Sequence, residues 1–61
     1  MHWEIEKRKN GLEIWVSNYK EYNISYFIGE VYDNTPKENA DIIKKHALVI
    51  KKALNNIKKG N

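Results

Sequence analysis

The chain has 61 residues, no cysteine and a formal net charge of +3. A chain this short forms one domain that is marginal as a monomer, and without cysteine it has neither disulfides nor thiolate metal sites to stabilise it. Two histidines are too few for an ordinary structural zinc site, so we expect no metal and no cofactor, and oligomerisation remains as the means of stabilisation.

The location of the protein is predicted from what its sequence lacks. No run of about 18 apolar residues is present, so we expect no membrane-spanning segment. The first residues do not have the layout of a signal peptide, and we expect a cytoplasmic protein.

Charge is distributed unevenly along the chain. Residues 1–35 carry four basic against six acidic side chains, whereas residues 36–61 carry seven lysines against two acids. The first part is therefore mildly acidic and the second part is basic, a pattern that can mark an electrostatic docking surface.

The first predicted unit is a β-hairpin. Residues 3–8 and 12–17 both alternate between apolar and polar side chains, as half-buried strands do. Asn10-Gly11 between them favours a two-residue turn, because both residues tolerate positive φ. Such a turn pairs Ile5 with Val16 and places one apolar set on a single face: Trp3, Ile5, Leu12, Ile14 and Val16.

A third strand is predicted over residues 22–32, which are rich in aromatic and β-branched side chains. Ile24, Tyr26 and Ile28 share one face of this strand, and Phe27 is left on the other. Gly29 is a candidate bulge, which would return Val31 to the face of Ile28.

The last predicted element is a helix over residues 36–59. Thr35 is the expected N-cap, Glu38 completes a capping box with it, and Gly60 is the expected C′ residue. Apolar residues recur at intervals of three and four along one face: Ala40, Ile43, Ala47, Ile50, Leu54 and Ile57. Such a helix is about 36 Å long, whereas a strand of seven or eight residues spans about 25 Å, so Leu54 and Ile57 should overhang the sheet.

The predicted fold class is α+β: a three-stranded antiparallel meander (sheet 2–33) followed by one long C-terminal helix (36–59) in a single domain, 1–61. The helix is expected to cover the apolar face of the sheet, formed by Trp3, Ile5, Ile14, Val16, Ile24 and Ile28. The small size and the overhanging helix end lead us to expect a homodimer.

Two surfaces remain after the fold is accounted for. Trp15 and Phe27 lie on the far face of the sheet, and Tyr19 and Tyr22 are candidates to join them there. These aromatics form a dimer seam or docking patch, or are simply neighbouring exposed side chains. Leu48 points outward among the lysines of the helix. The predicted protein interface therefore consists of Trp15, Phe27, Leu48, Leu54 and Ile57.

The lysines of the helix form the second surface. Their usual role is to solvate the outer side of an amphipathic helix, but they could also follow the phosphates of a nucleic acid. The candidate nucleic-acid-binding residues are Lys44, Lys45, Lys51 and Lys52. A meander followed by a basic helix resembles the C-terminal half of a double-stranded-RNA-binding domain, but the chain lacks the first helix and the lysine-rich helix start of that family.

Nothing in the sequence indicates catalysis. Ser17 and Ser25 have no evident histidine and acid partners, and no nucleophile motif or glycine-rich phosphate loop is present. We therefore expect a protein that is not an enzyme.

The chain resembles a group of short phage-encoded proteins. Ile28-Gly29-Glu30-Val31-Tyr32-Asp33 is similar to their strand of the "I-A-D-V" kind, and Glu38-Asn39-Ala40-Asp41-Ile42-Ile43 to their "ENA-x-L-I" helix, which ends in an "x-A-L" segment like Ala53-Leu54. The resemblance implies a phage origin and a protein that binds and disables host machinery, including anti-phage defence, as in the small anti-Hachiman proteins of Bacillus phages. It implies no site residue.

Three hypotheses follow. The first is a non-enzymatic, phage-encoded inhibitor or adaptor that acts as a homodimer on a host protein. The second is a basic nucleic-acid-binding module that uses the lysines of the helix. The third is a structural accessory module.

Overall fold

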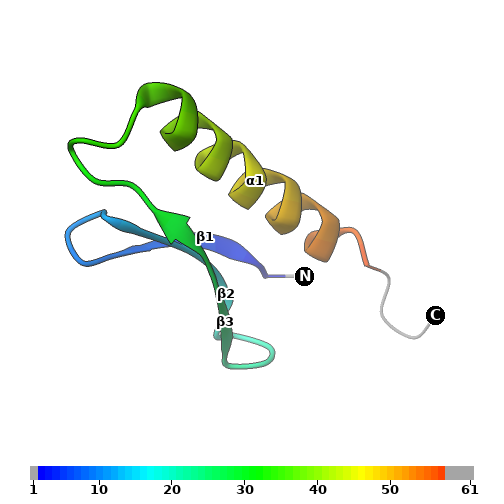
Figure 1. Ribbon diagram of the computed structural model, residues 1–61. Helices are drawn as coiled ribbons and strands as arrows, with labels where there is room; N and C mark the ends of the chain where they lie inside the picture. Colours follow the sequence, from blue (N-terminus) through cyan, green and yellow to red (C-terminus); the bar gives the residue numbers. More distant parts are fainter. Residues whose placement is uncertain (1, 58–61) are drawn as a thin grey trace.

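The computed structural model describes residues 2–57 and shows a three-stranded sheet with one helix on one of its faces (Figure 1). The strands are β1 (Glu4–Arg8), β2 (Glu13–Asn18) and β3 (Ile24–Glu30), and the helix is α1 (Lys37–Asn55). The strands are antiparallel and lie in the order β1-β2-β3. The predicted α+β class and the β-β-β-α order are thus confirmed.

The β1–β2 hairpin has the predicted register. Ile5 pairs with Val16, and the Leu12 N–H donates to the Lys9 carbonyl at 3.1 Å across the turn. Asn10 and Gly11 have φ values of 57° and 87°, which suit an Asn-Gly turn. Lys9 also has a positive φ, of 51°, so strand pairing ends at Arg8 and Glu13 and the expected Lys9–Leu12 pair is part of the turn. Side-chain alternation and turn chemistry agree here, so the register follows from the sequence alone.

The predicted bulge is present in β3. Ile14 pairs with Gly29 and Trp15 with Phe27, so Ile28 is an extra residue without a partner on β2. Both Ile28 and Val31 pack against the core, as the bulge prediction required.

Gly29 on β3 lies against the Ile43 side chain of α1. A Cβ at this position would be 3.1 Å from Cγ2 of Ile43, which is tighter than ordinary contact. The missing side chain therefore lets α1 approach β3, a role that glycine often has in strands.

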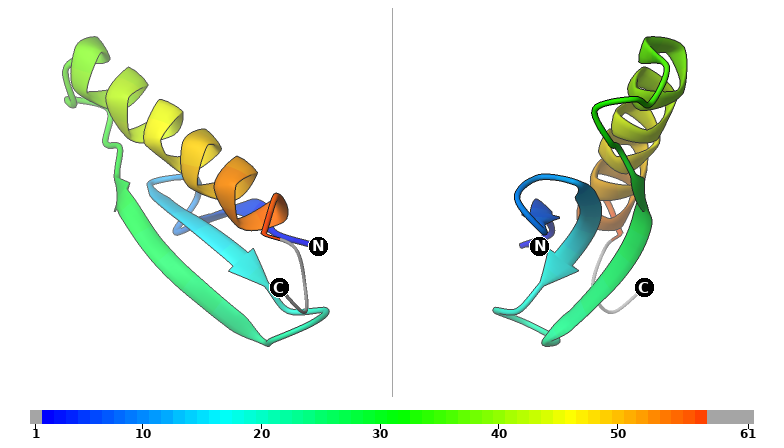
Figure 2. Two further views of the ribbon diagram at one scale, coloured as in Figure 1. Left: turned by 90° about the vertical axis from the view of Figure 1, so that its right-hand side faces the viewer. Right: turned by 60° about the vertical axis from the view of Figure 1, so that its left-hand side comes forward.

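The core lies between the sheet and the helix. Its buried members are Trp3, Ile14, Val16 and Ala47, surrounded by half-buried Ile5, Ile28, Val31, Ile43, Ile50 and Leu54. Trp3 stacks on Tyr26 with a centroid separation of 5.7 Å. The expectation that α1 covers Ile24 is wrong: Ile24 is 40% exposed, because the first half of β3 extends beyond the helix (Figure 2).

The start of the helix differs from the prediction. α1 begins at Lys37, its N-cap residue is Pro36, and no side chain caps it, so the capping box of Thr35 and Glu38 does not form. The Thr35 hydroxyl instead accepts a hydrogen bond from the Tyr32 N–H at 2.7 Å, and the Thr35 N–H donates to the Tyr32 carbonyl at 3.0 Å. The hydroxyl is used in the preceding turn, which is a common competing role for threonine.

The helix also ends earlier than predicted. Asn55 is its last residue and Asn56 its C-cap, so α1 has 19 residues and a length of about 28 Å rather than 36 Å. The Asn55 side chain accepts from the Trp3 N–H at 3.0 Å and donates to the Trp3 carbonyl at 3.1 Å, which ties the helix end to the start of the sheet. Lys58, Lys59 and Gly60 lie outside the described residues.

The shorter helix removes most of the expected overhang. Leu54 packs against the core and is half-buried. Ile57 follows the helix and is 56% exposed. Among residues 2–57, no helix is both long enough and apolar enough to cross a membrane.

Candidate functional site

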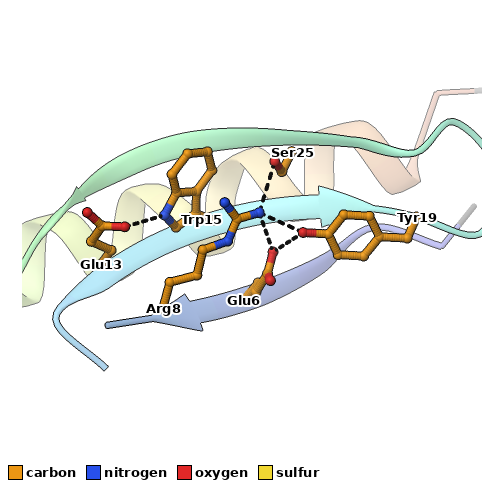
Figure 3. Close-up of polar contacts among 6 residues, drawn as sticks. All are labelled: Glu6, Arg8, Glu13, Trp15, Tyr19 and Ser25. Carbon is orange, nitrogen blue, oxygen red and sulfur yellow. Dashed lines mark hydrogen bonds and ion pairs between the residues drawn. The ribbon is translucent and has the colours of Figure 1, made fainter. Parts of the chain in front are cut away.

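The sheet face turned away from α1 carries a group of aromatic and charged side chains, which we call the open face (Figure 3). Strand alternation and the observed pairing show which strand residues point to this face, and the Arg8 hydrogen bond adds Tyr19 from the turn after β2. The open face consists of Glu4, Glu6, Arg8, Glu13, Trp15, Ser17, Tyr19, Ser25, Phe27 and Glu30.

Arg8 is the centre of the open face. Its guanidinium carbon lies 3.9 Å from the centroid of the Trp15 ring. Its Nη2 donates to Glu6 Oε1 at 3.0 Å, to Tyr19 Oη at 2.6 Å and to Ser25 Oγ at 3.0 Å (Figure 3). Arg8 therefore joins all three strands and the following turn, and its planar group is held in one orientation.

Trp15 is held from three sides. Arg8 lies over its ring, and its indole N–H donates to Glu13 Oε1 at 3.1 Å. Its ring meets that of Phe27 edge-on, with centroids 5.3 Å apart. Phe27 itself is 49% exposed, so its ring is the main apolar surface that the open face presents to solvent.

Ionic and hydrogen-bonding contacts stabilise the charged state of this network. The hydrogen bond from Arg8, followed by that from Tyr19 at 2.6 Å, lowers the pKa of Glu6 below its ordinary value. The same bond to Glu6 raises the pKa of Arg8. The pair therefore remains ionised throughout the physiological pH range.

The open face is acidic despite the positive net charge of the chain. Its strands contribute one cation, Arg8, and a second, Lys9, reaches Glu13 from the hairpin turn at 3.7 Å. These face four carboxylates, those of Glu4, Glu6, Glu13 and Glu30. The arrangement suits contact with apolar and cationic groups. It does not form a nucleophile and base pair, because the Ser25 hydroxyl accepts from Arg8 and no histidine is part of the network.

The five residues of the predicted interface do not lie on one surface. Trp15 and Phe27 are together, as expected. Leu48 is on α1 and is 55% exposed, Leu54 packs against the core, and Ile57 lies beyond the helix. The sheet therefore separates the aromatic pair from Leu48 and Leu54 of the helix.

Sequence reasoning did not identify Arg8 and Glu6 as site residues, and it named Tyr19 only as a candidate neighbour of Trp15 and Phe27. The hairpin register already placed Glu6 opposite Trp15 and Arg8 next to it, so the register was the available signal for these two. Tyr19 lies in a connection without periodicity, and no sequence pattern predicts that its hydroxyl reaches back to β1.

The candidate nucleic-acid-binding lysines lie along α1. Lys44, Lys45 and Lys52 are exposed and Lys51 is half-buried. Within the described part of the chain the ion pairs are Arg8–Glu6 and Lys9–Glu13, so none of these four lysines has an acidic partner there.

Two surface hollows are present among the described residues. One, of about 250 Å³, has a mixed polar and apolar lining and borders the Arg8 network through Tyr19; its other lining residues are His2, Glu4, Ser17 and Lys20. The other, of about 210 Å³, is mainly apolar and is lined by Ile5, Lys7, Ile14, Lys44, Ala47 and Leu48. In the range 2–57, no group of three or more acidic, histidine or cysteine side chains could hold a metal ion.

Comparison of the chain with protein-family models, with curated proteins and with solved structures gives no match. The function must therefore be inferred from the geometry of the chain itself.

Proposed function

We propose that the protein is a non-enzymatic binding protein that docks on a partner protein through the open face. The observation that carries the proposal is the Arg8 network: a guanidinium fixed on Trp15 by three hydrogen bonds, next to a half-exposed Phe27. Tryptophan, tyrosine and arginine are the residues that most often dominate binding energy at protein interfaces.

The rigidity of the network favours binding over a purely structural role. A side chain that is already held in one rotamer loses little entropy when a partner covers it. Arg8 and Trp15 are held in this way, although both belong to a sheet face that the helix does not cover. The face is therefore preorganised for contact with a rigid surface.

The charge of the open face indicates the chemistry of the partner. Four carboxylates surround the aromatic rings, whereas the cations among them are Arg8 and Lys9, whose ammonium lies 3.7 Å from Glu13 Oε2; this acidic surplus favours a basic protein surface. An arginine or lysine of the partner can lie over the exposed Phe27 ring while its charge meets Glu13 or Glu30.

The resemblance to short phage-encoded proteins suggests where such a partner is found. We propose that the target is a host bacterial protein, within the cytoplasm, and that docking inhibits it. Anti-phage defence proteins are the class of target that the resemblance implies.

The proposed homodimer requires a different surface. A symmetric contact of the open face with itself would bring two sets of four carboxylates together, which is unfavourable. Exposed apolar residues outside the open face are a better candidate for the contact between two copies: Ile24 and Tyr26 on β3, and Val49 on α1. Sedimentation as a monomer at high micromolar concentration would exclude this part of the proposal.

The docking proposal is tested by capture from bacterial lysate with matched variants. Phe27→Ser removes the exposed ring of the open face, and Ile42→Ser removes a similar exposed side chain from α1. We expect the wild type and Ile42→Ser to retain the same protein band after nuclease treatment, and Phe27→Ser to lose it. Equal capture by Phe27→Ser and the wild type would overturn the proposal.

Nucleic-acid binding is the second candidate, supported by the four helix lysines that have no acidic partner among residues 2–57. It requires affinity for duplex that falls steeply with salt and that weakens when Lys44, Lys51 and Lys52 are replaced by glutamate. Binding that is insensitive to salt would exclude it.

A further inference from the structure

The outer edge of β1 has unpaired backbone groups. β1 is a border strand, and the contact between its start and the helix end shows which of its backbone groups face outward. The Trp3 N–H and carbonyl both bond to the Asn55 side chain, so they point away from β2. Because alternate residues of a strand direct their backbone groups to the same side, those of Ile5 and Lys7 also point away from β2. In Figure 2 this edge is the border of the sheet opposite β3.

The apolar hollow lies beside this edge, between β1 and α1. Its lining includes Ile14 and Ala47, which are 2% and 0% exposed, with Ile5 on β1 and Leu48 on α1. Its 210 Å³ corresponds to about seven water molecules and is below the roughly 300 Å³ of ordinary small-molecule sites. The hollow therefore fits a single side chain better than a whole small ligand.

Two lysines flank the hollow. Lys7 comes from β1 and Lys44 from α1, and both are exposed. The ion pairs of the described residues include neither of them. Lys7 is on the helix side of an edge strand, a position where a charge disfavours pairing with an apolar strand. A carboxylate beside the two ammonium groups would remove this penalty.

We propose that the β1 edge and the apolar hollow form a second docking site, which binds an extended acidic segment of a partner protein. The segment adds to β1 as a fourth strand through the outward backbone groups of Ile5 and Lys7. Alternate side chains then lie on the helix side, where one apolar residue enters the hollow and its acidic neighbours reach Lys7 and Lys44. The site does not depend on the open face.

The same lysines favour a peptide over a nucleic acid at this position. Duplex binding depends on phosphate contacts, and single strands depend on aromatic side chains for base stacking. The lining of the hollow is aliphatic apart from the two lysines, so neither kind of nucleic acid makes use of its apolar surface.

The test uses the full chain and three labelled heptapeptides of defined composition. Thr-Glu-Thr-Leu-Thr-Glu-Thr places its leucine and both glutamates on one side of a strand. Thr-Thr-Glu-Leu-Glu-Thr-Thr has the same composition, but its leucine and glutamates fall on opposite sides. Thr-Lys-Thr-Leu-Thr-Lys-Thr reverses the charge. We expect fluorescence anisotropy to detect binding of the first peptide only, with slower amide hydrogen exchange at Ile5 and Lys7.

Matched charge reversals locate the site. Lys7→Glu and Lys44→Glu should each weaken binding of the first peptide about tenfold. Lys45→Glu makes the same change on the same helix outside the lining of the hollow, and should leave the affinity within about twofold.

Four results would overturn the proposal. The first is a loss of peptide affinity with Lys45→Glu equal to that with Lys7→Glu, and the second is equal binding of the rearranged peptide. The third is displacement of the peptide by duplex DNA. The fourth is that the chain without peptide forms a dimer, which Lys7→Glu dissociates. The third would assign the lysines to nucleic acid, and the fourth would assign the edge to a second copy of the chain.

Discussion

At the scale of single residues, the central feature is that Arg8 forms hydrogen bonds with residues from separate parts of the chain. Glu6 is two residues away in sequence, whereas Tyr19 and Ser25 are 11 and 17 residues away. Alternation predicted that Trp15 and Phe27 share a face, since a strand pattern contains that information. It could not predict the hydroxyl of Tyr19, because the position of a turn residue depends on how the turn closes.

The Glu6–Arg8 pair gives stability a defined pH dependence. The folded state lowers the pKa of Glu6, so the pair stabilises the fold above the unfolded pKa of about 4.3 and this contribution disappears as pH falls through the lowered folded pKa. The hydrogen bond from Asn18 lowers the pKa of Glu21 and acts in the same direction. We expect the urea midpoint to fall between about pH 5 and pH 2.

A variant of similar shape separates the contribution of Glu6 to this pH dependence from that of the other carboxylates. Glu6→Gln cannot ionise, so its urea midpoint should change less than that of the wild type over the same pH range. Glu4→Gln removes a carboxylate of the same face that accepts no side-chain hydrogen bond within residues 2–57. It should keep the wild-type profile. Identical profiles for Glu6→Gln and the wild type would contradict the role assigned to the pair.

At the scale of elements, the order and register of the strands were predictable, and the two ends of the helix were not. The hairpin register follows from two alternating segments and an Asn-Gly turn, all within a short stretch of sequence. The helix start depends on whether Thr35 bonds forward to the helix or back to Tyr32, and both are local options for a hydroxyl. The helix end depends on Asn55 meeting Trp3, 52 residues away, which no sequence window contains.

The packing of α1 on β3 depends on the missing side chain at Gly29. Gly29→Ala places a methyl group 3.1 Å from Ile43 Cγ2, so we expect a loss of about 1–2 kcal/mol in the free energy of unfolding. Urea denaturation followed by circular dichroism measures this loss.

A double-mutant cycle isolates the contact. Ile43→Ala removes all three atoms that crowd the new methyl group, so in that background Gly29→Ala should cost nothing or should stabilise by restricting the unfolded chain. An equal cost in both backgrounds would show that the glycine is needed for its backbone and not for the approach of Ile43.

At the scale of the whole molecule, the uneven charge of the sequence becomes a difference between two opposite faces. The open face carries four carboxylates around its aromatic rings, and the other layer carries the lysines of α1. The sequence predicted the two charge groups, but only the packing of α1 on one face of the sheet shows that they lie on opposite sides (Figure 1). A partner can therefore distinguish the two faces by charge alone.

The two faces also explain why the residues of the predicted protein interface belong to two separate sites. Leu48 borders the apolar hollow next to Lys44, and it belongs to the site proposed for an acidic segment. Trp15 and Phe27 belong to the acidic open face, which suits a basic surface. A single partner that contacted both would have to reach around the edge of the sheet at β1.

Site-specific photo-crosslinking tests the central claim most directly, because it reports which face touches the partner. A photoreactive phenylalanine analogue is placed at Phe27 on the open face, or at Ile42 on α1 as the control, and both variants are irradiated in nuclease-treated bacterial lysate. We predict a crosslinked protein from the Phe27 position that is absent from the Ile42 position and that is lost when Arg8 is replaced by alanine. Crosslinks from Ile42 without crosslinks from Phe27 would contradict docking through the open face.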